Sequence, residues 1–569
     1  MQLSKLFTKT SKNISADEVS INAQYLLRWG FINKTMAGVY SFLPLWLMVL
    51  NKIENIIRKH MDEVSQEILM PALQPIENRE KTGRLNSVDV LMKTTWANEK
   101  SKNKSTNEYI LGPTHEDLVT PLVQEYAKSH KDLPVSVYQI QNKFRNEARA
   151  KNGLLRGREF RMKDAYSFHA NEESLLQYYE EIKQVYVNIY KDLWLGEDTY
   201  VTAASGGDFT EKFSHEFQVK LESGEDVVFY DKKTGNAYNL EVAPCRAIEL
   251  DHDIDLKSYE EVFWEWIIWV NDLASFLWVQ PEQTTKTIIF KTDDGRVVAA
   301  AVRWDYEINE LKLQKVVWCK YLELAPAELI TELTGAIVWY AGIVNLPTSI
   351  ELYCDDSIEL RTNFECGCNK SNYHAINVNR DRDIPKPAHF YDFKEAKEWD
   401  ICPESGEIYE VFNACEVGNI FPLNTKFSKA FDYTYTDANN QKQIIYMWSY
   451  GIGPSRVMWV IVEKYHDEKW IIRPENIAPF THIIIPLKSE HKERAMRYYQ
   501  ELKGRWIDVC IDDRDLSPGN KFGDAELIGI PYQIILSDRV LEHGEDMVEL
   551  VDRKTGEKKI ISFNDLQYV

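Results

Sequence analysis

The chain has 569 residues, which is too long for one hydrophobic core and predicts three or four domains. Its formal net charge of −21 argues against a protein that coats nucleic acid, although a local basic patch remains compatible with it. An apolar share of 44% is ordinary for a globular protein. No signal peptide and no apolar run of about 18 residues occurs, so we expect a cytoplasmic protein without a membrane segment.

The eight cysteines form no disulfide framework and no convincing zinc site. Cys366 and Cys368 are separated by one residue, and Ser405 stands where a second thiolate would follow Cys402. Structural zinc takes four ligands, in pairs roughly two to four residues apart. We therefore expect no structural zinc.

The first elements are helices. Residues 15–18 (SADE) form a capping box that predicts a helix start, and a second helix should follow Pro44. This second helix carries apolar residues at three- and four-residue spacing, namely Leu50, Ile53, Ile57, Met61 and Val64. It leads into a short strand over residues 67–70 that Pro71 ends.

Two antiparallel strands are predicted next, over residues 135–145 and 158–168, with turn residues at 151–153 between them. From about residue 225 to 406 the chain is rich in tryptophan and acidic residues, in short strands and helices. We expect an inserted domain there, because the flanking stretches look like parts of one active site. After residue 474 an alternating βαβαβ pattern predicts a small, mostly parallel sheet. The predicted domains are 1–224 and 407–474 for a split catalytic domain, 225–406 for the insert and 475–569 for the C-terminal domain.

Three arginines are placed as if to bind a polyphosphate. Arg145 lies in the string FRNE (144–147), Arg156 opens the segment that ends at Phe160, and Arg456 follows the glycine turn GIGPS (451–455). Guanidinium groups bind phosphate oxygens in pairs and stay charged at any working pH. No GxxxxGK(S/T) string occurs, so the pattern indicates a user of nucleoside triphosphate without a P-loop.

The ordered set of helix, strand and Pro71, then FRNE with Arg156 and Phe160, then GIGPSR resembles motifs 1, 2 and 3 of the class II aminoacyl-tRNA synthetases. Finer strings are similar to those of the bacterial-type prolyl-tRNA synthetases: LGPTHED (111–117), REFRMKDAYSF (158–168), SHEF (214–217), EVGNIF (416–421) and GNKFGDAELIGIP (519–531). The resemblance covers essentially the whole chain. It implies an α/β multidomain fold with an antiparallel-sheet catalytic domain, an inserted α+β editing domain and a C-terminal α/β anticodon-binding domain.

The resemblance also implies the activity: ATP-dependent activation of L-proline to prolyl-adenylate, followed by transfer to tRNA(Pro), in a homodimer. Arg145 would hold the α-phosphate and the amino-acid carboxylate, Arg156 the outer phosphates, and Arg456 the γ-phosphate or the region of the adenine. Glu147 would accept from the adenine amino group or join Glu416 in holding Mg²⁺. The implied ATP site is completed by Phe160 and Gly453.

The implied proline site contains Thr114, Glu116, Arg145 and His215, while His115 is expected to be a loop or core histidine. A carboxylate suits the secondary ammonium of proline, whose two donors need acceptors. In the insert, the resemblance implies an editing site for alanyl-tRNA(Pro) that includes Lys286, Asp305, Gly335 and His374. Alanine is smaller than proline, and one missing methylene gives a pocket only about 1–3 kcal/mol of discrimination. Arg514, Lys521 and Phe522 are candidate anticodon contacts.

Two other functions remain open at this point. The chain could be a class II synthetase of the threonyl or seryl type, or a synthetase-like RNA-binding protein without catalysis. The second alternative predicts a broken ATP site, yet Arg145, Glu147, Arg156 and Arg456 are all present.

The tryptophans are anomalous. Nine of them stand where the resembling family has glycine: Trp46, Trp194, Trp278, Trp304, Trp339, Trp399, Trp448, Trp470 and Trp506. The chain has 25 glycines and 16 tryptophans, whereas a usual glycine share of about 7% would give about 40 glycines. We hypothesise that the gene belongs to a genome that reads UGA as glycine; the alternative is a divergent enzyme with aromatic substitutions. Trp448 is expected beside the ATP site and Trp506 at a helix end where glycine normally redirects the chain.

Overall fold

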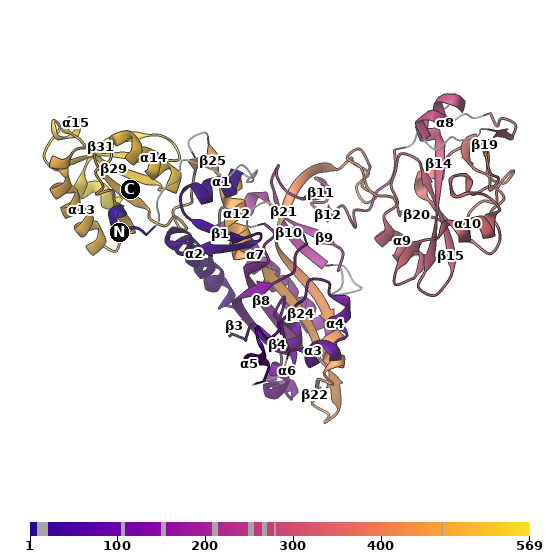
Figure 1. Cartoon of the computed structure of the whole chain (residues 1–569), viewed down its shortest axis with the longest axis horizontal. Coiled ribbons are helices and arrows are strands. Elements are labelled where there is room, and N and C mark those ends of the chain that lie inside the picture. The colour runs from indigo at the N-terminus through magenta and orange to yellow at the C-terminus, as the bar shows by residue number, and fades with distance from the viewer. Residues whose placement is uncertain are drawn as a thin grey trace. The chain divides into compact units, whose positions relative to one another are not determined.

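The structure is a computed structural model (Figure 1). It describes residues 1–7, 21–103, 108–148, 155–206, 214–248, 255–263, 270–277, 280–467 and 470–568. The predicted capping box at 15–18 and the turn at 151–153 lie outside these residues. The chain forms two compact units: Met1–Tyr200 with Gly206–Gly224 and Cys415–Val569, and Val201–Ser205 with Glu225–Ala414.

The catalytic part of the first unit contains helices and strands from both ends of the insertion. Its helices are α1 Ile21–Arg28, α2 Pro44–Met61, α3 Ile76–Lys81, α4 Arg84–Ser87, α5 Glu99–Lys102, α6 Glu116–Tyr126, α7 Glu172–Asp192, α11 Lys426–Ala430 and α12 Pro454–Lys464. Its strands are β1 Ile32–Met36, β2 Val39–Phe42, β3 Gln66–Glu67, β4 Leu73–Pro75, β5 Met92–Lys93, β6 Tyr109–Leu111, β7 Val135–Phe144, β8 Glu159–His169, β10 Ser214–Lys220, β21 Glu410–Asn424, β22 Thr434–Thr436, β23 Lys442–Ile444, β24 Tyr446–Ile452, β25 His466–Asp467 and β26 Trp470–Ile471.

An antiparallel sheet forms the centre of this part, as the sequence predicts. Strand β24 pairs with β8 on one side, with Ser449 opposite Tyr166, and with β21 on the other, with Gly451 opposite Asn419. Strand β8 continues into the antiparallel pair with β7, and β3 joins β7 in parallel. The strand that precedes the GIGPSR turn therefore lies beside the strands of the FRNE segment, although the insertion separates them in the sequence.

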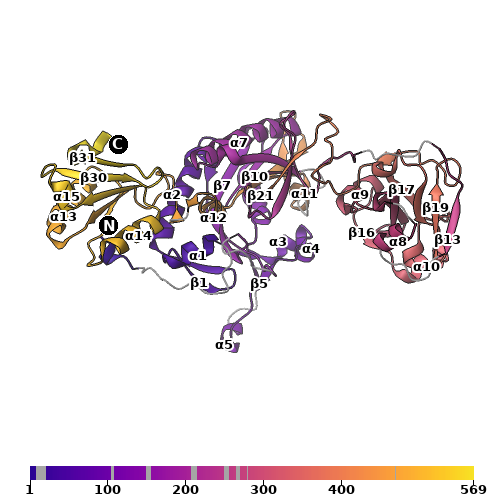
Figure 2. The same cartoon turned by 90° about the horizontal axis from the view of Figure 1, so that it is seen from above.

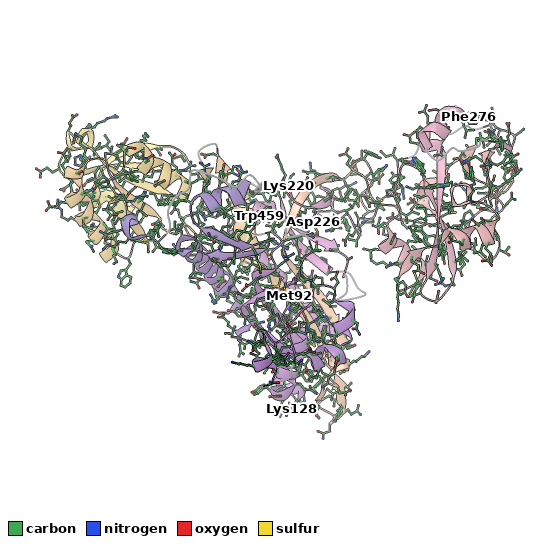
Figure 3. The ribbon with its side chains drawn as sticks, in the orientation of Figure 1. Met92, Lys128, Lys220, Asp226, Phe276 and Trp459 are labelled. Carbon is green, nitrogen blue, oxygen red and sulfur yellow. The ribbon has the colours of Figure 1, made fainter. Side chains whose placement is uncertain are left out.

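Helices bury one face of this sheet. Helix α7 packs against β8 and β24. Helix α2 packs against both α7 and α12 (Figure 2). The inward side of α7 is aromatic and aliphatic, with Tyr179, Ile182, Tyr186, Ile189 and Tyr190 buried at three- and four-residue spacing. On α12 the buried side chains include Trp459, which is 1% exposed (Figure 3). These helices do not cover the opposite face of the sheet, which is therefore available for a functional site.

The second unit has its own mixed sheet and core. Its elements are β9 Thr199–Ala204, β11 Asp226–Tyr230, β12 Ala237–Asn239, β13 Glu260–Phe263, α8 Val270–Leu277, β14 Thr284–Thr292, β15 Val297–Arg303, α9 Glu310–Val317, β16 Leu322–Leu324, α10 Ala327–Thr334, β17 Glu351–Asp355, β18 Phe364–Gly367, β19 Tyr373–Val378 and β20 Phe390–Tyr391. The main sheet runs in the order β13-β19-β18-β14-β15-β17-β20. The predicted insert spans 225–406; the unit also takes in Val201–Ser205 and continues to Ala414.

The C-terminal part of the first unit is an α/β domain. It contains β27 His482–Pro486, α13 Lys492–Gly504, β28 Val509–Ile511, α14 Pro518–Ile528, β29 Tyr532–Leu536, α15 Asp538–Leu541, β30 Met547–Asp552 and β31 Lys558–Ser562. Strand β27 is parallel to β28 and β29, and β30 and β31 extend the sheet in antiparallel fashion. The predicted βαβαβ pattern is thus present, with two added strands. In the described residues, no helix has the length and apolar character needed to cross a membrane.

Candidate functional site

A cavity of about 230 Å³ lies just after the end of β7, at the start of β8, beside the middle of β21, at the end of β24 and at the start of α12. All seven residues predicted for the ATP site line it: Arg145, Glu147, Arg156, Phe160, Glu416, Gly453 and Arg456. They come from two stretches of chain that the insertion separates. The sheet pairing described above is what brings them together.

Cations dominate this cavity. The guanidinium of Arg145 lies 5.3 Å from the ring centroid of Phe160, and its Nε donates to the carbonyl of Pro113 at 3.4 Å. Desolvation lowers the pKa of Arg145, and the nearby charge of Arg456 lowers it further. Two guanidinium groups that repel each other in a partly dry cavity create a strong positive potential. Such a site favours a polyanion.

Glu416 balances part of this charge. Its Oε2 accepts from Nη1 of Arg456 at 2.9 Å, and its Oε1 accepts from Nδ2 of Asn419 at 2.6 Å. Glu147 supplies a second carboxylate to the cavity wall. Carboxylate oxygens are ligands that Mg²⁺ prefers, so these residues fit a nucleotide-bound Mg²⁺.

The backbone at the floor of the cavity must stay bare at Gly418. A Cβ there would lie 2.4 Å from the hydroxyl of Tyr190 and 2.8 Å from the carbonyl oxygen of Gly451. Only glycine allows β21 to approach β24 and α7 this closely.

A second cluster surrounds Glu116 at the start of α6. Glu116 is 1% exposed, and its Oε2 accepts from the hydroxyl of Thr114 and from Nη1 of Arg84 at 3.0 Å. Its Oε1 accepts from the Ser449 hydroxyl at 3.3 Å. The structure therefore joins two predicted proline-site residues to Ser449 of β24, in the strand that leads to the ATP cavity.

The carboxyl of Glu116 is held ionised. Burial raises its pKa, but the charge of Arg84 and the Thr114 hydroxyl outweigh burial and lower the pKa to about 2. This interaction stabilises the fold fully above the ordinary glutamate pKa of about 4.5, and the stabilisation is lost as the pH falls toward 2. A buried carboxylate that keeps its charge is suited to bind an ammonium group.

Arg84 was not predicted from the sequence. It lies on the short helix α4, is 3% exposed, and also donates to Oδ2 of Asp117 at 2.9 Å. Arg79 pairs with the same carboxylate at 3.2 Å. A charged residue on a short helix normally faces solvent, so local sequence gives no signal for this network.

His115 is a core residue, in agreement with the expectation. Its Nδ1 accepts from the ammonium of Lys143 at 2.7 Å, and Lys143 also pairs with Asp164 at 2.7 Å. The geometry assigns the ring proton to Nε2, which donates to the carbonyl of Pro71 at 3.1 Å. Burial and the charge of Lys143 lower the pKa of His115 to about 4, so the ring is neutral near pH 7.

His215 lies on the α7 side of the sheet. Its ring packs on Tyr179 with 5.4 Å between centroids, and Phe217, two residues further along β10, packs on Tyr186 and Tyr190 of the same helix. Burial and Lys183 lower the pKa of His215 to about 4. Its role in proline binding stays a prediction.

Trp448 also faces α7. Its ring lies 4.6 Å from that of Tyr179, whereas the neighbouring Ser449 points to Glu116 on the other face. Trp448 does not line the cavity, so the expectation that it lies beside the ATP site is wrong, because side chains alternate along the strand.

The second unit contains a cavity of about 450 Å³ beside β14 and β19. Lys286 and His374 line it, as predicted, and Glu307 and Glu365 add carboxylates. Lys286 Nζ lies 2.8 Å from Oε2 of Glu307, and His374 Nδ1 lies 2.7 Å from Oε1 of Glu365. The His374 Nε2 atom is buried without a hydrogen-bond partner among the described residues. It is therefore an unused polar atom at the cavity wall.

The other two predicted editing residues have different surroundings. Asp305 accepts from Arg303 at 2.6 and 2.9 Å and lies 3.4 Å from Nζ of Lys397. Gly335 ends helix α10 in the left-handed conformation, with φ of 77°. Their editing roles stay predictions, whereas Glu365 is a cavity residue that the sequence did not single out.

In the C-terminal domain, two of the candidate anticodon contacts are engaged internally. Lys521 is 3% exposed, and its ammonium donates to the carbonyls of Pro486 and Asp512 at 2.9 and 3.1 Å. The expectation of an RNA contact is wrong for Lys521, because its ammonium group is buried and hydrogen-bonded inside the domain. Arg514 pairs with Asp512 and Asp524, each at 2.8 Å.

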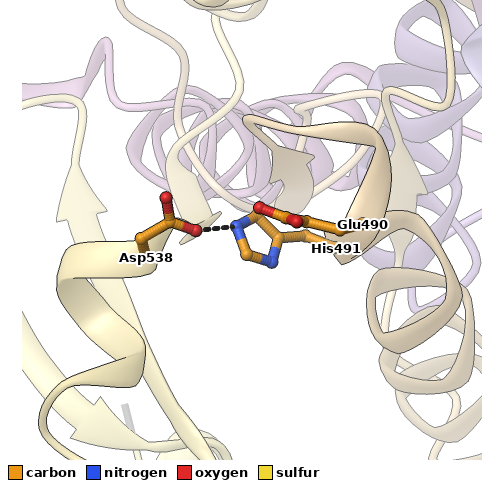
Figure 4. Close-up of side chains that lie close together, drawn as sticks. All are labelled: Glu490, His491 and Asp538. Atoms are coloured by element: carbon orange, nitrogen blue, oxygen red, sulfur yellow. Dashed lines mark hydrogen bonds and ion pairs between the residues drawn. The ribbon is translucent and has the colours of Figure 1, made fainter.

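Glu490, His491 and Asp538 lie close enough together in this domain to resemble a metal-ligand set (Figure 4). His491 Nε2 lies 3.0 Å from Oδ1 of Asp538, and the ammonium of Lys488 pairs with the same carboxylate. The hydrogen bond from Lys488 lowers the pKa of Asp538. The cluster is thus accounted for as an ion-paired contact between α15 and the segment before α13.

Comparison with known proteins identifies the family. The class II core domain of tRNA synthetases (G, H, P, S and T) matches residues 98–465, and the anticodon binding domain matches residues 482–568. The proline--tRNA ligases of Sulfurihydrogenibium sp. and Persephonella marina are each 41% identical, over 99% and 100% of this chain and 97% and 99% of their own lengths. That of Bacillus licheniformis is 36% identical over 100% of this chain and 97% of its own length.

A solved structure agrees at the level of the fold. The prolyl-tRNA synthetase from Cryptosporidium parvum, complexed with halofuginone and AMPPNP, has a TM-score of 0.56 and 15% identity, and the match covers 96% of this chain and 75% of that chain. The sequence relatives support the prolyl alternative over the threonyl and seryl ones. The chain therefore belongs to the proline--tRNA ligase family of class II aminoacyl-tRNA synthetases.

Proposed function

We propose that the chain activates L-proline with ATP and transfers it to tRNA(Pro), the activity that the names of its relatives give for those proteins. The observation that carries this proposal is the cavity in which all seven predicted ATP residues meet. The Glu116 cluster is linked to the same cavity through β24 and the Pro113–Arg145 contact. A triphosphate site and an ammonium site are therefore adjacent.

In the first step, a carboxylate oxygen of proline attacks the α-phosphorus of ATP. The new phosphorus–oxygen bond forms as the bond to the bridging oxygen breaks, and pyrophosphate leaves with the electron pair. Both reactants are anions, so catalysis depends on positioning and on cations near the α-phosphate. Arg145 serves this role, because it is the cation in the cavity that also contacts Pro113 next to the proline site.

The remaining cavity residues bind the nucleotide. Arg156 and Arg456 hold outer phosphates, with Phe160 and Gly453 completing the walls. Glu416 and Glu147 would hold Mg²⁺, which would neutralise part of the phosphate charge. Arg456, which donates to Glu416 at 2.9 Å, would hold phosphate from the same side of the cavity as this carboxylate.

Glu116 and Thr114 recognise the secondary ammonium of proline. The carboxylate supplies charge and one acceptor, and the Thr114 hydroxyl, which donates to Glu116, retains lone pairs for a second contact. Arg84 is a positioning residue, because it keeps Glu116 ionised without reaching the substrate.

Three further parts of the proposal are an editing reaction, an RNA interface and a dimer. Alanyl-tRNA(Pro) is hydrolysed in the cavity that Lys286 and His374 line, and the C-terminal domain binds the anticodon. A homodimer forms through the segment after α2, where Leu69 and Leu73 are 75% and 51% exposed.

Arg145→Lys should lower the kcat of proline-dependent ATP–pyrophosphate exchange by about 100-fold or more, because lysine cannot donate a bidentate pair to the reacting phosphate. Arg161→Lys is the matched control, since Arg161 lies on β8 but pairs with Glu54 at 2.8 Å. Its exchange rate should stay close to that of the unaltered chain. An Arg145→Lys variant that folds and exchanges at the unaltered rate contradicts the assigned role.

Arg84→Gln should raise the KM for proline about 10- to 100-fold and leave the KM for ATP unchanged, because a buried charged hydrogen bond is lost. The pKa of Glu116 then rises, so the proline KM should worsen as the pH falls from 8 to about 6. The unaltered chain should show no such dependence, since its Glu116 pKa is about 2. Arg79→Gln, which removes partners of Asp117, Gln74 and the Thr114 carbonyl but none of the Glu116 carboxylate, controls for lost stability. Equal pH profiles for both variants would refute the positioning role of Arg84.

His374→Ala should abolish hydrolysis of alanyl-tRNA(Pro) while proline-dependent pyrophosphate exchange continues at its normal rate. Lys286→Ala should behave in the same way. Lys291→Ala, on the same strand but paired with the exposed Glu323, is the control and should hydrolyse normally. Undiminished hydrolysis in both cavity variants would place editing elsewhere.

A further inference from the structure

Three tryptophans adopt a backbone conformation that tryptophan rarely takes. Trp194, Trp318 and Trp506 have φ angles of 62°, 58° and 64°. The other non-glycine residues with positive φ in the described chain are all asparagine or aspartate: Asn345, Asn363, Asn369, Asn372, Asn377, Asp381, Asn424, Asp432 and Asn440. Those short polar side chains tolerate the left-handed region, whereas a bulky side chain does not. The three tryptophans are therefore a distinct class.

Each of the three stands at the end of a helix, where the cap itself requires the left-handed turn. Trp194 follows α7, and the amide of Leu195 donates to the Tyr190 carbonyl at 2.8 Å. Trp506 follows α13, and the amide of Ile507 donates to the Leu502 carbonyl at 3.1 Å. These are the six-to-one hydrogen bonds of the Schellman motif, whose fifth residue is usually glycine.

Trp318 ends α9 in the same way. It is the C-cap residue, with ψ of 52°, and the amide of Cys319 donates to the Gln314 carbonyl at 3.2 Å. The sequence comparison with the family did not single out Trp318. Its conformation adds it to the set.

Glycine occupies the same cap positions elsewhere in this chain. Gly30 follows α1 with φ of 64°, and the amide of Phe31 donates to the Leu26 carbonyl at 2.9 Å, as after α7 and α13. Gly335 is the C-cap of α10, as Trp318 is of α9. Glycine is therefore the residue at the equivalent cap positions of α1 and α10.

At two of the three sites, packing of the side chain does not compensate for the energetic cost of the left-handed backbone conformation. Trp318 is 90% exposed and Trp506 is 95% exposed, so neither ring is buried against the protein. Trp194 is 38% exposed, with the Lys554 ammonium 4.4 Å above its ring. Large apolar side chains are rarely left this exposed without a partner.

Buried tryptophans show an independent defect. Trp29, Trp46, Trp448 and Trp459 are at most 5% exposed, and none of their indole Nε1 atoms has a hydrogen-bond partner among the described residues. A buried tryptophan N–H normally finds an acceptor. The protein interior therefore offers no hydrogen-bond acceptor to these four indole N–H groups among the described residues.

We infer that the functional protein carries glycine at positions 194, 318 and 506, and that tryptophan stands there because a UGA codon has been read as tryptophan. UGA is the codon that different genetic codes assign to stop, to tryptophan or to glycine, so one reassignment accounts for all three positions. If UGA encodes glycine at every tryptophan position, glycine also stands at the buried positions, and the glycine deficit of the chain is offset. The same reading also widens the cavity of the second unit, which Trp304 and Trp339 line.

The direct test is the mass of peptides from protein made by the source cells. The peptides that span residues 316–320 and 506–514 end at Lys320 and Arg514 and each contain one of the three tryptophans. Glycine masses are expected for both, together with UGA codons in the gene. Tryptophan in either peptide, or a UGG codon at either position, overturns the inference.

A second test uses the recombinant chain. Trp318→Gly and Trp506→Gly should each raise Tm by about 2 °C or more, because they relieve the left-handed strain and remove no buried contact. Gly335→Trp, where an added Cβ meets nothing within 4 Å, should lower Tm by a similar amount. Trp96→Gly, at a residue without positive φ, should give no increase. A Tm that is unchanged or lower in both Trp318→Gly and Trp506→Gly contradicts the inference.

Discussion

The pairing of β24 between β8 and β21 is the constraint on which the site depends. It places two stretches of chain, separated by the inserted unit, in adjacent strands of one sheet. Because side chains alternate along β24, Ser449 reaches Glu116 on one face while Trp448 packs on α7 on the other. The next turn then starts α12 and delivers Arg456 to the cavity. Without this register, the arginines on either side of the insertion would not meet.

Two charge arrangements follow from this scaffold, and they have opposite sign. The cavity at the start of α12 is lined by three guanidinium groups and two carboxylates, of which Glu416 pairs with Arg456. The neighbouring cluster holds a carboxylate that Arg84 keeps ionised despite burial. In the proposed function, polyphosphate and ammonium bind at separate ends of one site, and the carboxylate of the amino acid then lies beside the α-phosphate. This ordering is the physical basis for a reaction between two anions.

The sequence grouped correctly those residues that lie within short strings and share one cavity. The seven residues predicted for the ATP site lie in four such strings, and all of them line one cavity. Predictions were wrong or missing where interacting residues are distant in sequence or where the orientation of a side chain determines its contacts. Arg84 reaches Glu116 across 32 residues, Lys521 turns into its own domain, and Trp448 points away from the nucleotide. Trp318 required a backbone angle, which no sequence pattern supplies. The antiparallel pair β7–β8 and the βαβαβ domain were predictable because hydrophobic periodicity and turn residues determine them locally. The inserted unit was predicted from a change of composition between two stretches of one site, and the order of the strands in the sheet was not predicted.

The most direct measurement of the proposed function is amino-acid-dependent ATP–pyrophosphate exchange, using protein purified from its source cells. Proline, threonine and serine should be compared at equal concentration, with each reaction repeated without Mg²⁺. We predict strong stimulation by proline alone, and only with Mg²⁺ present, because Glu116 and Arg145 define an ammonium site next to a phosphate site. Stimulation by threonine or serine in place of proline, or no stimulation by any amino acid, would contradict it.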